Sequence, residues 1–288
     1  MNILILGGTK YMGVHLMNEL LKDGHDVTTA TRGITADLFG DKIKRLIIDR
    51  QDPASLQEKF RDKYYDVAID NIAYSSNDIR YLLEVLKVKK YIMTSTVSVY
   101  SQHFHEKMQE DEVDTKNHPL EWHNFEDLTY DEAKRQAEAA LFQAYPDQPS
   151  AAVRFPFIFG KDDYTKRLFF YVDHILNEKP MNVDNLKSRL SFINSQEAGK
   201  FLAHVAINPI FGAVNASSIG TISLEEIITY VESNSGKKAI INDEGELAPL
   251  NQAPSFSLDV TLAKNSGFQF RNIADWVYPL LDHWIEIL

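Results

Sequence analysis

The stretch Ile3–Gly13, with the sequence ILILGGTKYMG, decides the fold of this chain. Four apolar residues lead into Gly7 and Gly8, and a third glycine, Gly13, stands at the start of the amphipathic segment 12–24. A glycine turn between a strand and a helix lets backbone N–H groups approach a pyrophosphate at the helix N-terminus. The pattern predicts a dinucleotide-binding turn with contacts from Gly7, Thr9, Lys10, Tyr11, Met12 and Gly13.

Strand-like and helix-like segments alternate along the first half of the chain. Apolar runs predict strands at 2–8, 25–33, 43–53, 65–74, 89–100 and 150–160. Helical periodicity predicts helices between them at 12–24, 54–63, 77–88 and 129–146. Such alternation produces right-handed βαβ units and a parallel sheet covered on both faces. We therefore predict an α/β fold, a Rossmann-type doubly wound parallel sheet, over residues 1–160.

The alternation becomes irregular beyond the sixth predicted strand. Further segments of regular periodicity follow at 191–208, 223–237 and 272–288. We predict a small C-terminal substrate lobe over residues 161–288, interleaved with the last sheet strands. The polar stretch 102–126 contains several histidines and is expected to form a loop beside the site. Because no further ligand pattern accompanies those histidines, we predict no metal site.

Composition excludes several classes of protein. The chain has 288 residues, 44% of them hydrophobic and 25% charged, and a net charge of −11. A nucleic-acid binder usually has a basic footprint, so this charge disfavours a nucleic-acid partner. The absence of cysteine excludes disulfides, thiolate catalysis and cysteine-based zinc sites. Because no apolar run could span a membrane and no signal peptide precedes the first strand, we expect a cytoplasmic protein, monomeric or homodimeric, that acts on a small molecule.

The choice of cofactor is indicated by two basic residues. Lys10 occupies the place of the middle glycine in the usual G-x-G-x-x-G fingerprint. The second predicted strand ends in ATRG at 30–33, where an acidic residue would hold the ribose hydroxyls of NAD. The arginine found there, Arg32, can instead bind a 2′-phosphate bidentately. We therefore predict NADP, with NAD as the alternative, and interpret Lys10 as a second cation near cofactor phosphate.

A tyrosine and a lysine open the predicted helix 129–146. Tyr130 and Lys134 are four residues apart, so their side chains share one helix face. A nearby ammonium stabilises the phenolate and lowers the pKa of the tyrosine. A tyrosine tuned in this way can move the proton of an alcohol while a hydride passes to or from nicotinamide. The preceding strand can supply a hydroxyl to polarise the substrate oxygen, from Thr94, Ser95, Thr96 or Ser98.

These motifs resemble the short-chain dehydrogenase/reductase superfamily, in its extended, epimerase/dehydratase-like branch. GGTKYMG is similar to that branch's GGxGFIG turn, and TSTVSVY and TYDEAK resemble its catalytic segments. The resemblance implies a catalytic set of Thr96, Tyr130 and Lys134. IIDRQD, VAIDNIAY and VRFPFIFG resemble segments that line the cofactor. The predicted cofactor contacts are completed by Arg32, Asp49, Arg50, Asn71, Ile72, Ala73, Tyr74, Thr94, Lys134, Phe155 and Pro156.

The sequence also departs from that branch. Phe157 stands where nucleotide-sugar enzymes usually keep an Asn, and Leu190 stands where many carry Arg-Asp. We expect an NAD(P)-dependent oxidoreductase or epimerase/dehydratase-like enzyme that moves a hydride at a hydroxyl or carbonyl of a small, sugar-like substrate. The alternative is a non-catalytic regulatory or RNA-binding member, since some proteins with similar GGTRFIG turns are chloroplast stem-loop RNA-binding proteins. We interpret Lys166 and Arg167 as a solvated face rather than as contacts to an anionic substrate.

Overall fold

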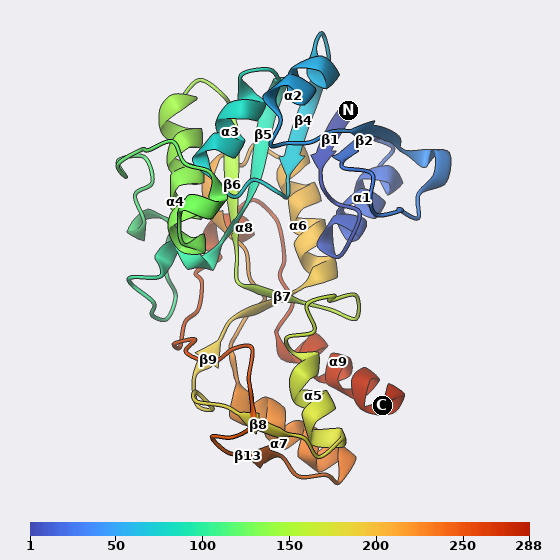
Figure 1. Ribbon diagram of the computed structural model, residues 1–288, viewed down its shortest axis with the longest axis vertical. Helices are drawn as coiled ribbons and strands as arrows, with labels where there is room; N and C mark the ends of the chain where they lie inside the picture. Colours follow the sequence, from blue (N-terminus) through green and yellow to red (C-terminus); the bar gives the residue numbers. More distant parts are fainter.

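A seven-stranded parallel sheet forms the centre of the protein, whose computed structural model describes residues 1–288 (Figure 1). Its strand order is β11-β6-β5-β4-β1-β2-β3, and every neighbouring pair is parallel. This order confirms the predicted Rossmann-type α/β fold. The strands are β1 (Asn2–Leu6), β2 (Asp26–Thr31), β3 (Lys44–Ile47), β4 (Tyr64–Asp70), β5 (Lys87–Thr96), β6 (Ser150–Phe155) and β11 (Gly212–Asn215).

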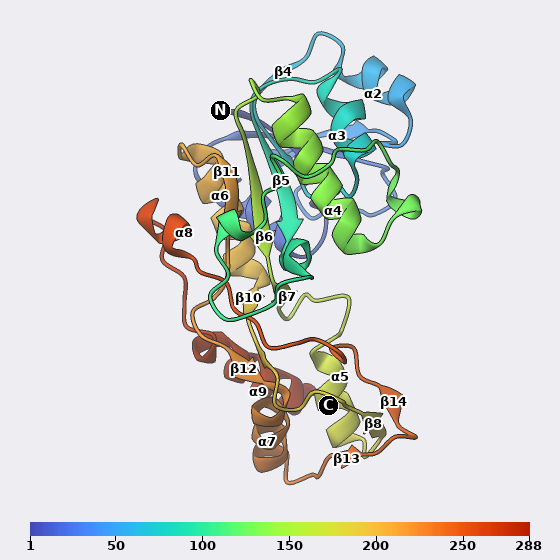
Figure 2. The same ribbon diagram turned by 90° about the vertical axis from the view of Figure 1, so that its left-hand side faces the viewer.

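Helices cover both faces of this sheet (Figures 1 and 2). One face carries α2 (Pro53–Phe60), α3 (Ser76–Leu83) and α4 (Tyr130–Ala139). The other face carries α1 (Met12–Lys22) and α6 (Ser195–Ile207). The predicted helix 129–146 begins at Tyr130 as expected, but its last turn is π-helical.

Strand β1 shows why the first apolar run has no polar alternation. Ile3 and Ile5 pack in the hydrophobic cluster shared with α1 and α6, whereas Leu4 and Leu6 pack in the cluster under α2, α3 and α4. All four side chains are fully buried. A strand buried on both faces needs apolar residues at every position, which is the pattern that the sequence shows.

The C-terminal lobe lies beyond the carboxyl-terminal edge of the sheet, at the bottom of Figure 1. It combines three small sheets, with strand orders β10-β7, β12-β9 and β13-β8-β14, and a group of packed helices, α5, α7 and α9. None of the helices in the chain has the length and the apolar content that a membrane crossing requires. The remaining elements are α5 (Phe169–Leu176), α7 (Leu224–Ser235), α8 (Thr261–Asn265), α9 (Ala274–Ile287), β7 (Phe157–Phe159), β8 (Pro180–Asn182), β9 (Arg189–Leu190), β10 (Phe192–Asn194), β12 (Ile222–Ser223), β13 (Ile240–Ile241) and β14 (Glu246–Leu247).

Pro156 divides the predicted strand 150–160 into two. Proline has no N–H to donate to a sheet ladder, so the strand is interrupted there. β6 ends at Phe155 in the central sheet, and β7 starts at Phe157 and pairs with β10 of the lobe. The chain therefore passes from sheet to lobe at this proline, beside the carboxyl ends of the strands.

The lobe segment 161–288 also returns to the sheet. Helix α6 packs along α1, and β11 adds the edge strand beside β6. The segment is thus interleaved with the last sheet strands, while the division of the chain into domains at residue 160 remains a prediction. The contact between α1 and α6 is close because it is made at Gly199, where a Cβ would lie 2.6 Å from the Met12 carbonyl oxygen and 2.7 Å from the Leu16 nitrogen.

We expect Gly199→Val to lower the free energy of unfolding by about 1–3 kcal/mol, the usual cost of forcing extra atoms into a packed interface. The neighbouring Lys200 is exposed on the same helix, so Lys200→Val carries only the helix-propensity cost, about 0.5 kcal/mol. Urea denaturation of both variants measures the difference. Equal losses would show that the backbones of α1 and α6 can separate without cost.

Candidate functional site

Two cavities share the side chain of Tyr74 and lie at the carboxyl ends of the parallel strands, where open α/β sheets bind ligands. The larger, here called the β2 cavity, has a volume of about 730 Å³. The smaller, the β5 cavity, has a volume of about 250 Å³. The β2 cavity is lined by Gly7, Thr9, Thr31, Arg32, Ile34, Thr35, Ile48, Asp49, Arg50, Gln51, Ile72, Tyr74, Asp78, Tyr81, Asn124, Phe125 and Glu126. The β5 cavity is lined by Tyr11, Met12, Asn71, Tyr74, Thr94, Ser95, Thr96, Val97, Ser98, Tyr130, Lys134, Phe155, Pro156, Phe157, Ile158, Tyr164, Thr165 and Arg167.

The glycine turn lies between β1 and α1. Gly7 and Gly8 have φ values of +78° and +92°, which side-chain-bearing residues rarely adopt. A Cβ at Gly13 would lie 2.2 Å from the Gly8 Cα, so the two glycines pack backbone to backbone. The N-terminus of α1 has no side-chain cap. It therefore retains the capacity of a helix N-terminus to bind an anion.

Asn71 supplies a free donor beside this turn. Its Oδ1 accepts a hydrogen bond of 2.8 Å from the Thr94 hydroxyl, whereas its buried Nδ2 has no partner. That Nδ2 lies 3.7 Å from a Cβ built at Gly8. A buried donor without a partner is costly, and a ligand oxygen at this place would satisfy it. The turn, the uncapped helix and this amide fit the pyrophosphate of a dinucleotide.

Two arginines line the β2 cavity, one buried in ion pairs and the other exposed and unpaired. Arg50 is buried and forms ion pairs of 2.8 Å with Asp70 and 3.0 Å with Asp78, so its charge is neutralised inside the protein. Arg32, which follows the end of β2, is exposed and forms no ion pair. The acidic side chains that line the same cavity are Asp49, Asp78 and Glu126, and none of them forms an ion pair with Arg32. Arg32 is therefore the arginine whose guanidinium is available to a ligand.

Lys134 is buried on α4 and reaches the ends of β4 and β5. Its Nζ donates hydrogen bonds to the Ala73 oxygen at 2.7 Å and to the Thr94 oxygen at 2.8 Å. The same nitrogen lies 4.6 Å from the centroid of the Tyr74 ring. Burial lowers the pKa of Lys134 to about 8. An ammonium has three donors, so two carbonyls leave one free for a ligand.

Tyr130 lies one helical turn earlier, next to Thr96. Tyr130 is 43% exposed as a residue, but partial desolvation of its hydroxyl raises the pKa of that group, while the hydrogen bond with Thr96 and the charge of Arg167 lower it to a smaller extent. The net direction is opposite to the lowered pKa that the sequence predicted, because the effect of desolvation is larger than that of any neighbouring charge. Lys134 directs its ammonium at backbone carbonyls and not at this phenol.

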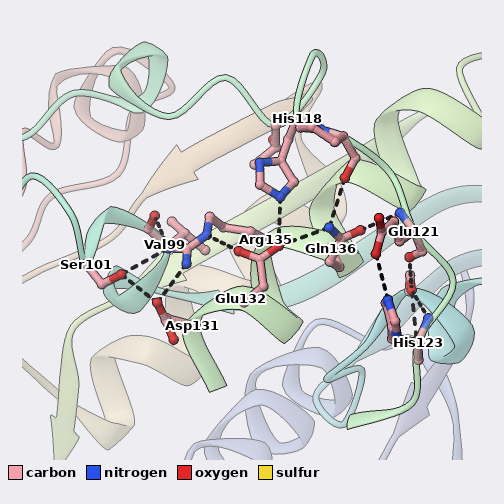
Figure 3. A network of polar contacts seen from close by, with 12 residues as sticks. Val99, Ser101, His118, Glu121, His123, Asp131, Glu132, Arg135 and Gln136 are labelled. Carbon is pink, nitrogen blue, oxygen red and sulfur yellow. Dashed lines mark hydrogen bonds and ion pairs between the residues drawn. The ribbon is translucent and has the colours of Figure 1, made fainter. Parts of the chain in front are cut away.

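The polar loop 102–126 is held against α4 (Figure 3). The His118 ring pairs with Glu132 at 2.8 Å, and Gln136 donates to the Pro119 oxygen at 2.9 Å and accepts from the Glu121 nitrogen at 2.8 Å.

These contacts bring Phe125 into the site. Its ring centroid is 5.3 Å from that of Tyr74 and 6.3 Å from that of Tyr130. The expectation of a loop beside the site is therefore confirmed.

The structure brings most of the sequence-predicted residues to the two cavities. Three of them line neither. Gly13 lies within the turn, the Ala73 carbonyl accepts from Lys134, and the Lys10 ammonium lies 5.8 Å from the Tyr164 ring centroid at the lobe side of the turn. The predicted contact of Lys10 with cofactor phosphate stays a prediction.

Sequence reasoning missed the segment that follows Pro156. Ile158, Tyr164, Thr165 and Arg167 all line the β5 cavity. The signal was present in the topology, because any segment that leaves the carboxyl end of a sheet strand borders the ligand site. The loop 102–126 was expected beside the site, but its residues that line the β2 cavity, from Asn124 to Glu126, were not singled out.

Comparison with known proteins places the chain among dinucleotide-binding folds. Residues 3–216 match the model of the NAD dependent epimerase/dehydratase family. The chloroplast stem-loop binding protein of 41 kDa b from Arabidopsis thaliana is 26% identical over 243 residues, which is 79% of this chain and 60% of that protein. The chain thus spans about three fifths of that relative's length.

Two solved structures have the same fold over their whole length. A UDP-glucose 4-epimerase from Thermotoga maritima, solved with UDP-glucose, superposes with a TM-score of 0.79 at 15% identity, covering 100% of this chain and 99% of that chain. The protein Pal from Bacillus thuringiensis superposes with a TM-score of 0.75 at 17% identity, covering 100% of this chain and 99% of that chain. At these identities the likeness establishes the fold alone.

The buried ammonium makes stability depend on pH. Because its pKa is about 8 in the folded chain and about 10.4 in an unfolded one, the unfolded state binds more protons between these values. The cost of burying the charge is full below pH 8 and disappears as the pH rises. The unfolding free energy of the wild type, relative to Lys134→Met, should therefore rise by up to about 1.4 kcal/mol per pH unit in this window.

Urea denaturation at several pH values between 7.5 and about 10 measures this slope. Lys89→Met is the control, because the hydrogen bond to Asp66 raises the pKa of Lys89 and keeps its titration above this window. A difference between wild type and Lys134→Met that stays constant with pH would contradict the lowered pKa.

Proposed function

We propose that this chain, which belongs to the NAD-dependent epimerase/dehydratase family, binds NADP across the two cavities and moves a hydride at a hydroxyl or carbonyl carbon of a small, sugar-like substrate. One observation carries the proposal. Thr96, Tyr130 and Lys134 line the β5 cavity together, and this cavity adjoins the glycine turn. When bound, the nicotinamide of the cofactor would donate or accept the hydride.

The cofactor contacts follow from the free donors of the site. The uncapped N-terminus of α1 and the Asn71 amide suit the pyrophosphate, and Arg32 suits a 2′-phosphate. Phe155 and Pro156, at the end of β6, provide apolar surface in the β5 cavity for the nicotinamide ring. The other predicted cofactor contacts in the β2 cavity are Gly7, Thr9, Asp49, Arg50, Ile72 and Tyr74.

The proton chemistry belongs to Tyr130. Its raised pKa keeps the phenol protonated at neutral pH, so it is suited to donate a proton to a carbonyl oxygen that receives the hydride. Thr96 provides a second hydroxyl to hold that oxygen. The third N–H of Lys134 is free to bind a ribose hydroxyl, while its other two hold the ends of β4 and β5 together.

A second candidate function is the binding of stem-loop RNA, which the name of the curated relative from Arabidopsis suggests. The net charge of −11 disfavours it, because non-specific RNA affinity depends on basic side chains that neutralise phosphates. The two candidates separate experimentally, since phosphate contacts weaken steeply with salt and hydride transfer leaves a nicotinamide absorbance signal.

Arg32→Ala tests the cofactor assignment. A charge-assisted bidentate hydrogen bond contributes about 1.5–3 kcal/mol, so the NADPH affinity should fall about 10- to 100-fold. NADH affinity should hardly change, because NADH has no 2′-phosphate. Titration calorimetry measures both, with Arg61→Ala as the control, since Arg61 is exposed and lines neither cavity. Equal affinities of the wild type for the two cofactors would count against NADP, and a firm preference for NADH would end the assignment.

Tyr130→Phe tests the mechanism. Removing only the hydroxyl should lower turnover by about 10²- to 10⁴-fold, the usual contribution of a positioned acid or base, with cofactor affinity unchanged. A screen of carbonyl compounds with NADPH must first supply a substrate. Thr96→Ser should retain more activity than Thr96→Val, because serine keeps the hydroxyl.

Wild-type turnover in Tyr130→Phe would show that this mechanism is wrong. Retention of a stem-loop RNA at low salt that weakens at high salt would then favour the second candidate, because phosphate contacts depend on salt.

A further inference from the structure

The β5 cavity carries positive charge without any acidic side chain. Among its lining residues, Lys134 and Arg167 are basic, and none is Asp or Glu. This is unusual in a chain with 41 acidic and 30 basic residues. A cavity with low-dielectric walls and one sign of charge attracts ligands of the opposite sign.

Arg167 is held in place without a direct ion pair to a carboxylate. Its Nε donates a 3.1 Å hydrogen bond to the Thr165 hydroxyl oxygen, and the Thr165 hydroxyl donates in turn to Asp163 Oδ1 at 2.5 Å. The guanidinium carbon lies 5.4 Å from the Phe157 ring centroid and 5.9 Å from that of Phe159. The Arg167 guanidinium is therefore oriented by Thr165 and by the two phenylalanine rings. Its terminal nitrogens form no hydrogen bond or ion pair within the chain.

This state distinguishes Arg167 from most arginines of the chain. Arg32 and Arg167 are the two arginines that line a cavity without a carboxylate partner, one in each cavity. Arg61 lies on an exposed turn, and Arg80 stacks on Trp122 with its guanidinium carbon 4.9 Å from the ring centroid. The six arginines that form ion pairs with carboxylates are Arg45, Arg50, Arg135, Arg154, Arg189 and Arg271.

The cofactor does not account for Arg167. The nicotinamide ring is neutral when reduced and positively charged when oxidised, so neither form offers a negative charge to a guanidinium. The phosphates belong with the glycine turn and with Arg32. Arg167 is nevertheless near the reacting group, because its charge lowers the pKa of the Tyr130 hydroxyl, although burial has the larger, opposite effect. Under the proposed function, the ligand left to supply an anion for Arg167 is the substrate.

We propose that Arg167 binds an oxyanion, a carboxylate or a phosphoryl group, on the substrate, so that this protein acts on small acidic molecules. The inference rests on the proposed function for the reaction itself. A planar guanidinium with two free terminal nitrogens matches such a group bidentately. The β5 cavity, about 250 Å³, also has to hold the nicotinamide ring in the proposed function, so the space left for a substrate fits only a small molecule. The sequence interpretation of Arg167 as part of a solvated face is therefore corrected. The side chain lines the β5 cavity and is half-buried.

The reagent phenylglyoxal, which modifies free guanidinium groups, tests this inference without a known substrate. Modification of each arginine is followed by mass spectrometry, with acetate as the carboxylate probe, inorganic phosphate as the phosphoryl probe and acetamide as the neutral counterpart. Ionic strength is kept equal with sodium chloride. At twice its dissociation constant, a bound anion should slow the modification of Arg167 about threefold. Acetamide should not slow it.

Two other arginines provide the controls in the same sample. Arg61 lies on an exposed turn and should be modified at the same rate with every probe. Arg32 reports the proposed cofactor site, because NADP should protect it through the 2′-phosphate. Failure of NADP to protect Arg32 would count against the proposed function and leave the oxyanion site standing.

The protection of Arg167 from modification tests the oxyanion site itself. Stronger protection by acetate would mark a carboxylate substrate, and stronger protection by phosphate a phosphorylated one. Protection no greater than that of Arg61 would overturn the inference, and so would an Arg167 that does not react at all. In a second measurement, Arg167→Met should keep its NADPH affinity within about twofold, because the anion is not on the cofactor. A larger loss would assign Arg167 to the cofactor.

Discussion

The backbone contact between Gly8 and Gly13 is the constraint on which the rest of the site depends. A Cβ at Gly13 would lie 2.2 Å from the Gly8 Cα, so any side chain there would push α1 away from β1. The contact sets the N-terminus of α1 directly at the end of β1. It also sets the distance of α1 from the sheet. Because α6 packs on α1 at Gly199, the contact sets the position of α6 as well. The placement of α1 at the end of β1 and the position of α6 therefore depend on the same turn.

The turn is also tied to the segment that carries Arg167. The Tyr11 hydroxyl, within the turn, donates to the Ile158 oxygen of β7. On the first turn of α1, His15 pairs with Asp162 at 3.0 Å, and Asp162 accepts a 2.6 Å hydrogen bond from Ser195 at the start of α6. The segment that leaves the sheet at Pro156 is thus fastened to both helices of one face. Residues of the two cavities that are far apart in sequence therefore share one set of contacts.

Short-range sequence patterns were enough to predict the fold and part of the site. The strand, glycine turn and helix at the N-terminus and the spacing of Tyr130 and Lys134 are short-range features, and their residues lie where the sequence predicted. Three features depend on contacts between distant segments. Arg50 is neutralised by Asp70 and Asp78, burial reverses the expected pKa shift of Tyr130, and Arg167 faces a cavity. The spacing of residues in a sequence does not show which charged side chains meet in the folded chain. These three features could therefore not be predicted from the sequence.

A basic side chain can bind a ligand anion only where no carboxylate of the protein already neutralises it. Arg50 lines the β2 cavity as Arg32 does, but two buried carboxylates neutralise it, and releasing it would leave those charges buried and unpaired. Arg32 and Arg167 have no such partners, so a ligand anion can bind them without breaking an existing ion pair. In a chain with net charge −11, acidic side chains are plentiful, yet none lines the β5 cavity. Two unpaired guanidinium groups, one per cavity, would therefore orient an anionic cofactor and an anionic substrate from opposite ends of the site.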